Sequence, residues 1–476
     1  MDRRDFTPWD TVAYVWKALG LPNDALESLH LPVDTECYPS SFKVDHLAQA
    51  SIGLSALSAA LVWSVRNDDT TPKVTVPAEH ACVEFKSERL YVLNGKAAPS
   101  TFGTIGGLHK TQDGYIRMHD SFPNHRQHAL RILGLNESAS REDVAQKMLG
   151  WKSIDLETEA IREGAVMAAL RSFDEWDALP QSKAIADFPI LLNRVAKGEP
   201  HLPDRTASTH APKCLHGIRV VEMSRVIAAP VAGKTLAAHG ADVVWITSPS
   251  LPDLPDLDID LSRGKRTVQL DIKNPDHKSK LMELLRTADV FIQSYRPGSL
   301  AAQGLSTDEL VALNPNLIVA SLNAYGPEGP WSQRRGFDSL VQTCSGINVA
   351  DAERYGAKEA AGVLPCQAFD HGAGYLLATG IVAALYKRAT EGGSYEVKVS
   401  LAGVMRYLRS LGQYEAKSGF ERKDFKRPED VDQYMETRST GFGQLKAVKH
   451  AAEIDGVKVG WDIMPSALGS EDPVWL

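Results

Sequence analysis

The clearest pattern in the chain is a regular alternation of apolar and amphipathic stretches that begins near residue 215. The apolar runs IRVVEM, ADVVWI, DVFIQSY and LIVASLNAYG alternate with amphipathic runs such as KSKLMELLRT and TDELVALN. Short apolar runs predict buried strands, and apolar positions spaced by three and four predict helices. Strands alternating with helices are typical of a parallel sheet covered by helices. We therefore expect an α/β fold for this part of the chain.

A second pattern occurs twice. Residues 44–66 read VDHLAQASIGLSALSAALVWSVR, and residues 369–388 read FDHGAGYLLATGIVAALYKR. Each stretch starts with Asp-His, continues as an apolar run of small residues, and leads through a polar turn into a V-x-V alternation that predicts a strand. We expect a buried helix followed by a strand in both places, at residues 73–85 and 395–408, and interpret the pair as an internal duplication. A further strand is expected at residues 367–369, with Asp370 as the cap of the second helix.

The remaining segments predict further units. The stretch HKTQDGYIRMHDSF at residues 109–122 predicts a hairpin around its Asp-Gly turn, and short helices are expected at residues 125–135, 141–150 and 155–163. The proline-rich residues 199–212 predict a linker. We expect an N-terminal segment (1–85) that adds a helix and a strand to the large domain, a small α+β domain (86–200), a large α/β domain (213–414) and a C-terminal tail (415–476) that packs on the body.

Composition excludes several classes of function. The net charge of −8 argues against nucleic-acid binding, which needs a broad basic surface. The five cysteines are scattered without a C-x-x-C pair, so we expect neither a disulfide framework nor a metal site. The N-terminus does not resemble a secretory signal, and the apolar stretches at residues 47–65 and 372–386 are short or interrupted by polar residues. A cytoplasmic protein without a membrane span or a tightly bound cofactor is expected.

Two nucleotide-binding motifs are excluded, and a cluster of positive charge is predicted instead. Gly233-Lys234-Thr235 lacks the upstream glycine of a P-loop, and no G-x-G-x-x-G follows the first strand of the sheet. Functional loops in parallel sheets follow the carboxyl ends of the strands; here these loops are residues 224–230, 262–267, 296–298, 325–338 and 367–374. They carry the positive residues Arg225, Arg263, Lys265, Arg266, Arg296, Arg334 and Arg335. Each alone is typical of a solvated surface, but together they suit a ligand with several phosphates.

Residues 215–414 resemble the family III CoA-transferases, a group that includes formyl-CoA and carnitine CoA-transferases and α-methylacyl-CoA racemase. The resemblance is carried, in family order, by VVEMSRVIAAPVAGKTLAAHGADVVWI, SRGKRTVQLDI, ADVFIQSYRPG, LNPNLIVASLNAYGPEGPW, RRGFDSLVQTCSG and the stretch around Asp370. It implies a Rossmann-like sheet, CoA or acyl-CoA and a carboxylic acid as substrates, and an intertwined homodimer. It also implies roles for site residues: Asp370 as nucleophile, Lys265, Arg296 and Arg335 as contacts of the CoA nucleotide and phosphates, Arg225 in the lining of that site, and Phe337 beside the thioester.

The resemblance also implies a mechanism. An aspartate with a pKa near ~4 is ionised at neutral pH and attacks a thioester without a separate base. The attack gives a mixed anhydride and then an aspartyl-CoA thioester, from which the acceptor acid takes CoA. We expect the backbone N–H groups of residues 371–374, at the start of a helix, to stabilise the developing oxyanions.

Three departures from the family keep alternatives open. Phe337 occupies the position at which the racemases need a histidine, which argues against an acyl-CoA racemase or epimerase. Only FGTIGG at residues 102–107 is comparable to the glycine-rich loop of the transferases. Residues 42–200 resemble what normally follows the catalytic aspartate, so the order of parts is permuted or partly duplicated and Asp45 is a second copy of the catalytic position, interpreted as a helix cap. A catalytically silent acyl-CoA-binding homologue is the remaining alternative.

Overall fold

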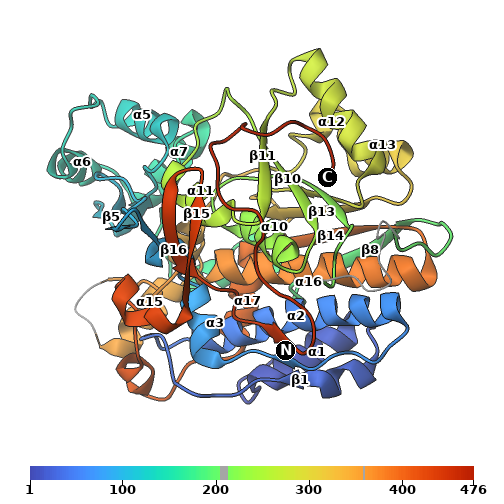
Figure 1. The fold of residues 1–476 in the computed structure, drawn as a ribbon. Helices are drawn as coiled ribbons and strands as arrows, with labels where there is room; N and C mark the ends of the chain where they lie inside the picture. The colour runs from blue at the N-terminus through green and yellow to red at the C-terminus, as the bar shows by residue number, and fades with distance from the viewer. Residues whose placement is uncertain (204–212, 357–359) are drawn as a thin grey trace.

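The computed structural model describes residues 1–203, 213–356 and 360–476 (Figure 1). The predicted linker lies outside the described residues from residue 204 onward. The largest sheet has seven strands in the order β11-β10-β9-β12-β13-β14-β8, all parallel except β8, which is antiparallel to β14. These strands are β11 (Lys265–Gln269), β10 (Asp242–Thr247), β9 (Arg219–Met223), β12 (Val290–Gln293), β13 (Ile318–Asn323), β14 (Ser394–Ser400) and β8 (Leu191–Ala196). The predicted α/β fold is confirmed.

Helices cover both faces of this sheet because neighbouring residues of a strand point to opposite sides. In β9, Val220 belongs to the core that contains α10 and α16, whereas Val221 belongs to a second core under α12 and α13. The helices of the large domain are α10 (Ala228–Ala238), α11 (Pro255–Leu261), α12 (Pro275–Thr287), α13 (Thr307–Leu313), α14 (Asp338–Cys344), α15 (Ile347–Tyr355), α16 (Ala368–Glu391) and α17 (Leu401–Ser410), with the short 3-10 turn η2 (Ala301–Gln303).

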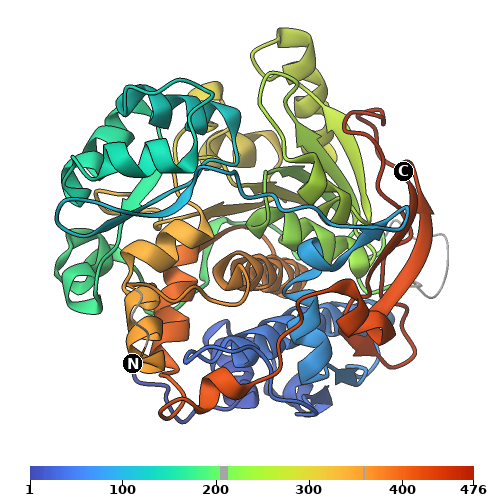
Figure 2. The ribbon, with the colours of Figure 1, turned by 90° about the vertical axis from the view of Figure 1, so that its left-hand side faces the viewer.

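The two repeated apolar stretches form the helices α2 (Val44–Asn67) and α16, which pack against each other. Both are long and apolar enough to cross a membrane by length and composition, yet 89% of the most apolar window of α2 and 100% of that of α16 are buried inside the protein. Figure 2 shows α16 nearly end-on at the centre of the molecule. The predicted core helices are therefore confirmed, while their origin by duplication stays a prediction.

The strands expected after both helices are shorter than predicted. The first copy contains only β2 (Val74–Thr75) before α3 (Ala78–Glu84) begins, and the second ends as β14 at Ser400 before α17 begins. Pro77 precedes the first turn of α3, and the Ser400 hydroxyl accepts the N–H of Gly403 at 3.0 Å. A side-chain cap by Ser400 therefore ends the second strand, whereas at the first strand Pro77, which has no N–H group to pair in a sheet, precedes the helix.

The glycines of α16 are required by close packing. A Cβ atom on Gly374 would lie 2.5 Å from the carbonyl oxygen of Ala228 and 2.6 Å from Cβ of Val231, both at the start of α10. A Cβ atom on Gly372 would meet only the ends of the Leu47 and Val404 side chains, at 3.1 Å. Gly374 therefore allows α16 to lie directly against α10.

We expect Gly374→Ala to lower the free energy of unfolding by about 1–3 kcal/mol, because the added methyl group meets backbone that cannot give way. Gly372→Ala is the matched control and should cost less, because its neighbours are flexible side-chain ends. Denaturant unfolding of both variants measures the difference. Equal stability losses would contradict this account of the α10–α16 contact.

The small domain has its own hydrophobic core. It contains β5 (Gly107–Lys110), β6 (Tyr115–Met118) and β7 (Met167–Ala169), with α5 (Pro123–Ile132), α6 (Arg141–Met148) and α7 (Ser153–Glu163). The predicted hairpin is the antiparallel pair β5–β6, and the three predicted helices are present. The small domain was predicted to end at residue 200. In the structure, α8 (Phe173–Ala178) and α9 (Pro180–Ala184) are followed by β8, which belongs to the large sheet.

The N-terminal segment extends past its expected end at residue 85, through β4 (Lys96–Ala97), and is interleaved with the C-terminal tail. The strand β16 (Gly443–Val448) lies between β15 (Met435–Thr440) and β3 (Val92–Leu93), and β2 lies between β1 (Leu29–His30) and β17 (Glu453–Ile454). The other elements of these two regions are α1 (Pro8–Ala18), η1 (Asn23–Ser28), α4 (Ser87–Leu90), β4 (Lys96–Ala97), η3 (Ser418–Glu421) and η4 (Pro428–Tyr434). Strands of the tail thus pair with strands of the N-terminal segment.

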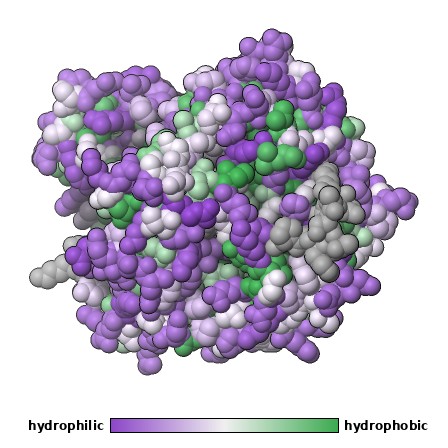
Figure 3. All heavy atoms as spheres, in the orientation of Figure 1, coloured by the Kyte–Doolittle hydropathy of each residue, from purple (hydrophilic) through white to green (hydrophobic). Residues whose placement is uncertain are grey.

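The five cysteines are all buried and free. Hydrophobic residues on the face shown in Figure 3 gather in small separate patches among hydrophilic ones. Within the described ranges, no group of His, Cys, Asp and Glu residues has an arrangement that could hold a metal ion.

Candidate active site

A cavity of about 280 Å³ lies at the carboxyl ends of the parallel strands and is bordered by the small domain. Its lining includes Arg225, Val226, Ala228, Ala229, Tyr295, Arg296, Arg334, Arg335, Phe337 and Asp370, with Phe122 and His125 from the small domain. The structure therefore brings together five of the six residues predicted for the site. Lys265 is not among them.

Asp370 lies in the first turn of α16, but not as its cap. The helix begins at Ala368 with Gln367 as the N-cap residue, so the strand expected at residues 367–369 is absent. Oδ2 of Asp338 accepts the N–H groups of Phe369 at 2.7 Å and of Asp370 at 3.1 Å. Asp338, the first residue of α14, thus caps α16, which fixes the Asp370 backbone and leaves its carboxylate at the cavity.

The prediction that the N–H groups of residues 371–374 stabilise oxyanions is wrong. The N–H of His371 already donates to the carbonyl of Gln367 at 3.1 Å, and the two N–H groups before it are held by Asp338. The start of α10 is a better source, because no side chain caps it and Ala228 and Ala229 line the cavity. Free N–H groups at a helix start attract anions. Val226 directly before this helix has a φ of +72°, a costly left-handed conformation for a β-branched residue.

The charge state of Asp370 differs from the sequence-based expectation. Burial raises the pKa of Asp370 well above its usual range, and the nearby carboxylates Asp338 and Glu88 raise it further, while Arg89 opposes the shift. Burial also raises the pKa of Asp338 to about 6, against its hydrogen bonds from Gln342 and the helix start. The site thus favours the protonated form of Asp370, so attack by its carboxylate would first require loss of that proton.

This shift predicts that Asp370 destabilises the fold at neutral pH. In the unfolded chain the carboxyl loses its proton near pH ~4, whereas the folded protein retains it to higher pH, so the free energy of unfolding falls as pH rises through this window. We expect Asp370→Asn, which cannot ionise, to melt at a higher temperature than the parent protein at pH 7 to 8 and to lose this advantage as the pH approaches ~4. Thermal unfolding over this pH range tests the sign. A melting difference that does not change with pH would contradict the assigned shift.

Glu88 and His371 form a buried hydrogen-bonded pair beside Asp370 that sequence reasoning missed. Oε2 of Glu88 lies 2.9 Å from Nε2 of His371, and the side chains are each 1% exposed. Arg89 donates to Oε1 of Glu88 at 3.2 Å and to Oε1 of Gln367 at 2.9 Å. Glu88 and Arg89 belong to the N-terminal segment, so no local signal around Asp370 could have indicated them.

Four of the predicted cations line the cavity: Arg225, Arg296, Arg334 and Arg335. Arg225 has two guanidinium nitrogens, Nε and Nη2, that are buried without a hydrogen-bond partner in the described residues, and its guanidinium lies 4.5 Å from the ring centre of Phe122. Arg296 and Arg335 are exposed at the same cavity, and Arg335 donates to the carbonyl of Gly164 at 3.3 Å. Burial of guanidinium groups without a carboxylate costs free energy, and a phosphate would recover it.

Lys265 is a correction to the predicted cluster. The segment expected as a loop at residues 262–267 turns into the edge strand β11, and this places Lys265 in the interior. Its Nζ lies 2.9 Å from Oε1 of Glu222 and donates to the carbonyl of Pro230 at 2.7 Å, with both charged side chains fully buried. Arg263 and Arg266 likewise pair internally, with Asp260 and Asp242. The geometry therefore offers no phosphate contact for these three residues.

Phe337 lies at the cavity as predicted, under side chains from the small domain. Its ring stacks on the imidazole of His119, with ring centres 3.9 Å apart and an angle of 11°. Phe122 and His125 complete this aromatic cover at 6.0 Å and 5.9 Å from Phe337. Burial lowers the pKa of His119 to about 3 and that of His125 to about 4, so both rings are neutral at physiological pH. A neutral aromatic cover limits the access of water to Asp370.

Asp45 occupies the equivalent place in α2 but has a different environment. Its carboxylate accepts the hydroxyl of Tyr414 at 2.8 Å and is bound by Arg422 from the C-terminal tail. The Asp370 carboxylate, in contrast, has no hydrogen bond or ion pair within the described part of the chain. The Asp45 side chain is satisfied by its partners, whereas that of Asp370 faces the cavity.

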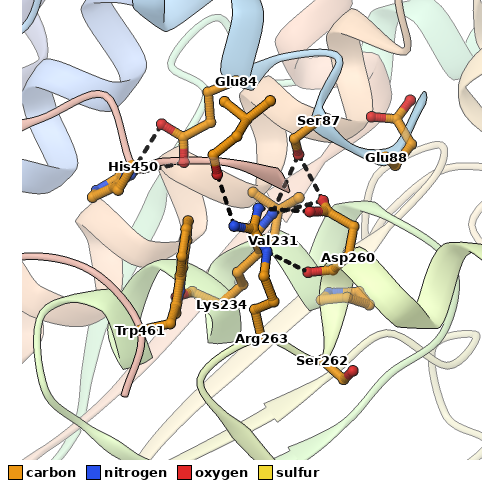
Figure 4. A network of polar contacts seen from close by, with 12 residues as sticks. Glu84, Ser87, Glu88, Val231, Lys234, Asp260, Ser262, Arg263, His450 and Trp461 are labelled. Atoms are coloured by element: carbon orange, nitrogen blue, oxygen red, sulfur yellow. Dashed lines mark hydrogen bonds and ion pairs between the residues drawn. The ribbon is translucent and has the colours of Figure 1, made fainter. Parts of the chain in front are cut away.

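A buried polar network holds the N-terminal segment next to the site (Figure 4). Asp260 binds Nζ of Lys234 at 2.7 Å, Nη2 of Arg263 at 2.6 Å and the hydroxyl of Ser87 at 2.7 Å. Burial alone would raise the pKa of Asp260, but the two cations outweigh it and hold the pKa below its usual range. Ser87 directly precedes Glu88, so this network sets the position of the residues that adjoin Asp370.

A second branch of the network reaches the tail. Glu84 binds Nδ1 of His450 at 2.7 Å, and Trp461 lies 4.0 Å from the guanidinium of Arg263. Figure 4 shows these side chains converging from the N-terminal segment, the large domain and the tail. Distant parts of the sequence therefore meet behind the cavity.

Comparisons with known proteins find relatives among CoA-transferases. The family model described as CoA-transferase family III matches residues 215–431. An acyl-CoA transferase of Gibberella moniliformis is 25% identical over 77% of this chain and 71% of its own length. A formyl-CoA:oxalate CoA-transferase of Rhodopseudomonas palustris is 34% identical over 41% of this chain and 48% of its own length.

A solved structure is also similar in sequence. The crystal structure of Rv3272 from Mycobacterium tuberculosis shares 32% identity over 42% of this chain and 56% of that chain, with a TM-score of 0.37. The chain spans 37%, 61% and 48% of the length of three curated relatives that it matches. The matched region contains the parallel sheet, Asp370 and the arginines of the cavity. Residues 215–431 are therefore similar to CoA-transferase family III.

Proposed function

We propose that the protein transfers CoA from an acyl-CoA to a free carboxylic acid, with Asp370 as the nucleophile. The observation that carries this proposal is the Asp370 carboxylate, which faces the cavity without a partner in the described residues. Arg225, Arg296 and Arg335 around the same cavity suit the phosphates of CoA. The relatives whose names include CoA or acyl-CoA transfer support the same activity.

The reaction conserves atoms and charge without a cofactor. A carboxylate oxygen of Asp370 attacks the thioester carbonyl carbon, the C–S bond breaks, and CoA leaves as a thiolate. The thiolate attacks the Asp370 carbonyl of the mixed anhydride and releases the donor acid, which leaves an aspartyl-CoA thioester. The acceptor carboxylate then attacks this thioester, and the returning thiolate cleaves the second anhydride, which yields the new acyl-CoA and free Asp370.

The residues around Asp370 fit these steps. Binding of the CoA phosphates covers the cavity, while Arg89 favours the ionised form of Asp370. The N–H groups of Ala228 and Ala229 can stabilise the oxyanions that develop during acyl transfer. Phe337 and His119 form a dry wall beside the anhydride, which water would otherwise hydrolyse.

A panel of acyl-CoAs and carboxylic acids, analysed by mass spectrometry for new thioesters, tests the proposal. We expect a new acyl-CoA only when a free acid is present, and no incorporation of solvent deuterium at the α-carbon of the donor. Deuterium incorporation without exchange of CoA would instead identify an epimerase. Binding of CoA with no turnover over the whole panel would identify a catalytically silent homologue.

A further inference from the structure

A second cavity of about 220 Å³ lies next to the active site. His119 lines this second cavity, and Phe337, which stacks on His119, lines the first. Gln367, the N-cap residue of α16, lines the second cavity, whereas Asp370 lines the first and not the second. A ligand in the second cavity would therefore lie beside the active site without being placed to react with Asp370.

Arg117 gives the second cavity a positive charge that no carboxylate pairs with. Nε of Arg117, on β6, donates to the hydroxyl of Thr343 at 2.9 Å. Among the residues that the structure describes, this is the only hydrogen bond of its guanidinium, and no carboxylate lies within ion-pair distance of it. Burial and the nearby Arg141 lower the pKa of Arg117, while Asp338 opposes the shift. A guanidinium in this setting gains free energy when an anion binds to it.

The other ionisable side chains in the wall of the cavity do not change this balance. Oδ2 of Asp120 accepts the N–H groups of Ile105 at 2.9 Å and of Gly106 at 2.8 Å. Asp120 is thus bound to the backbone and does not pair with Arg117. Burial lowers the pKa of His119 to about 3, so its ring is neutral at physiological pH.

Arg89 connects the second cavity with Asp370. Its Nη2 donates to Oε1 of Gln367 at 2.9 Å, and its Nε donates to Oε1 of Glu88 at 3.2 Å. Its guanidinium also lies 5.8 Å from the ring centre of Phe102, another residue of the cavity. The charge of Arg89 lowers the pKa of Asp370 against the effect of burial. An anion in the second cavity would offset that charge and make loss of the proton from Asp370 less favourable.

The second cavity also has apolar walls. Phe102 and Val363 line it and are 48% and 58% exposed. Met118 and Leu364 line it as well and are buried. Exposed apolar side chains near a cation suit a ligand whose charged group carries a hydrocarbon part. One unpaired cation and the small volume favour a single negative charge and a short chain.

We propose that the second cavity is a regulatory site for a monoanion with a short hydrocarbon chain, in particular a free carboxylic acid, and that its occupation slows the reaction of Asp370. The carboxylate binds Arg117, and the hydrocarbon chain packs beside Phe102 and Val363. The inference rests on the proposed CoA transfer, which consumes one free acid and releases another. Binding at this site makes the rate of transfer respond to the concentration of free acid.

Butane-1-sulfonate is the probe for this site, because it is a monoanion with a short chain that forms no thioester with CoA. In CoA exchange with the best donor and acceptor of the panel above, we expect it to lower kcat severalfold and to leave the KM for the acyl-CoA unchanged. Uncharged 1-butanol and methanesulfonate, which lacks the chain, should inhibit at least about 10-fold more weakly. Competition between the probe and the acyl-CoA would place the probe in the first cavity and overturn the proposal.

Arg117→Gln tests the assigned contact. We expect it to raise the Kd for butane-1-sulfonate about 10- to 100-fold, as loss of a hydrogen bond to a charged group does, and to relieve the inhibition. Exchange in the absence of the probe should keep the parent rate. Arg117→Lys keeps the charge and should retain most of the binding. Arg131→Gln, at an exposed ion pair with Glu163, is the matched control and should leave the Kd unchanged.

Calorimetry with the probe separates this inference from the proposed function, because binding needs no turnover. Thermal unfolding of each variant shows whether it is folded. No binding to the parent protein, or equal Kd values in the parent protein and Arg117→Gln, would overturn the second site and leave the proposed CoA transfer intact. Binding that depends on Arg117 but does not change the rate of exchange would overturn the regulatory role. Absence of exchange over the whole panel would overturn the proposed function and its regulation, while binding that depends on Arg117 would still identify the anion site.

Discussion

Replacing Asp370 with asparagine is expected to lower the rate of CoA exchange by at least about 10³-fold, because the amide cannot attack the thioester. The side chain keeps its size, and Asp338 still binds the helix start through the backbone N–H groups of residues 369 and 370. CoA binding should therefore persist, since the arginines of the cavity are unchanged. Exchange of labelled acid into acyl-CoA, measured together with the Kd for CoA, tests both parts.

Asp45→Asn is the matched control, because Asp45 occupies the corresponding position in α2. Its carboxylate is bound by Tyr414 and Arg422 and does not line the cavity. We expect exchange in this variant to stay within a few-fold of the parent rate. Loss of exchange in Asp45→Asn with retention in Asp370→Asn would reverse the assignment of the two sites.

The second large effect is expected on stability. Asp260→Ala should lower the free energy of unfolding by about 3–5 kcal/mol, because it leaves Lys234 and Arg263 buried without their carboxylate. Denaturant unfolding measures this loss. Asp177→Ala removes a surface ion pair with Arg409 and should cost less than about 1 kcal/mol.

We expect Asp260→Ala also to change the position of residues at the active site. Ser87 loses its acceptor in Asp260→Ala, and Ser87 precedes the Glu88–Arg89 pair that adjoins Asp370. A stability loss as small as that of Asp177→Ala would show that the network in Figure 4 is not what joins the segments behind the cavity.

Local periodicity predicted the parts of the fold whose stabilising contacts repeat along the sequence. The parallel strands, the helix α16 and the hairpin β5–β6 each carry a pattern of apolar positions that fits only one type of secondary structure. The edge strand β11 was interpreted as a loop because its sequence, KRTVQ, is polar. Its cations are buried by carboxylates from other elements, such as Glu222 for Lys265, and a single stretch of sequence does not contain that information.

In the candidate site, too, some features were predicted from the sequence and others were not. The resemblance to the family predicted five residues that meet at one cavity: Asp370, Arg225, Arg296, Arg335 and Phe337. The raised pKa of Asp370 was not predicted, because it results from burial and from Asp338 and Glu88, one of which lies in the N-terminal segment. Contacts between residues so distant in the chain are set by tertiary packing. The intertwined homodimer and the cytoplasmic location stay predictions.

The central claim is a covalent intermediate on Asp370, and hydroxylamine trapping tests it most directly. The protein is incubated with acyl-CoA and hydroxylamine, digested and analysed by mass spectrometry. The account predicts a hydroxamate on the peptide that contains Asp370, and none on the peptide that contains Asp45. Exchange of CoA that proceeds without any modification of Asp370, or with a hydroxamate on another residue, would contradict it.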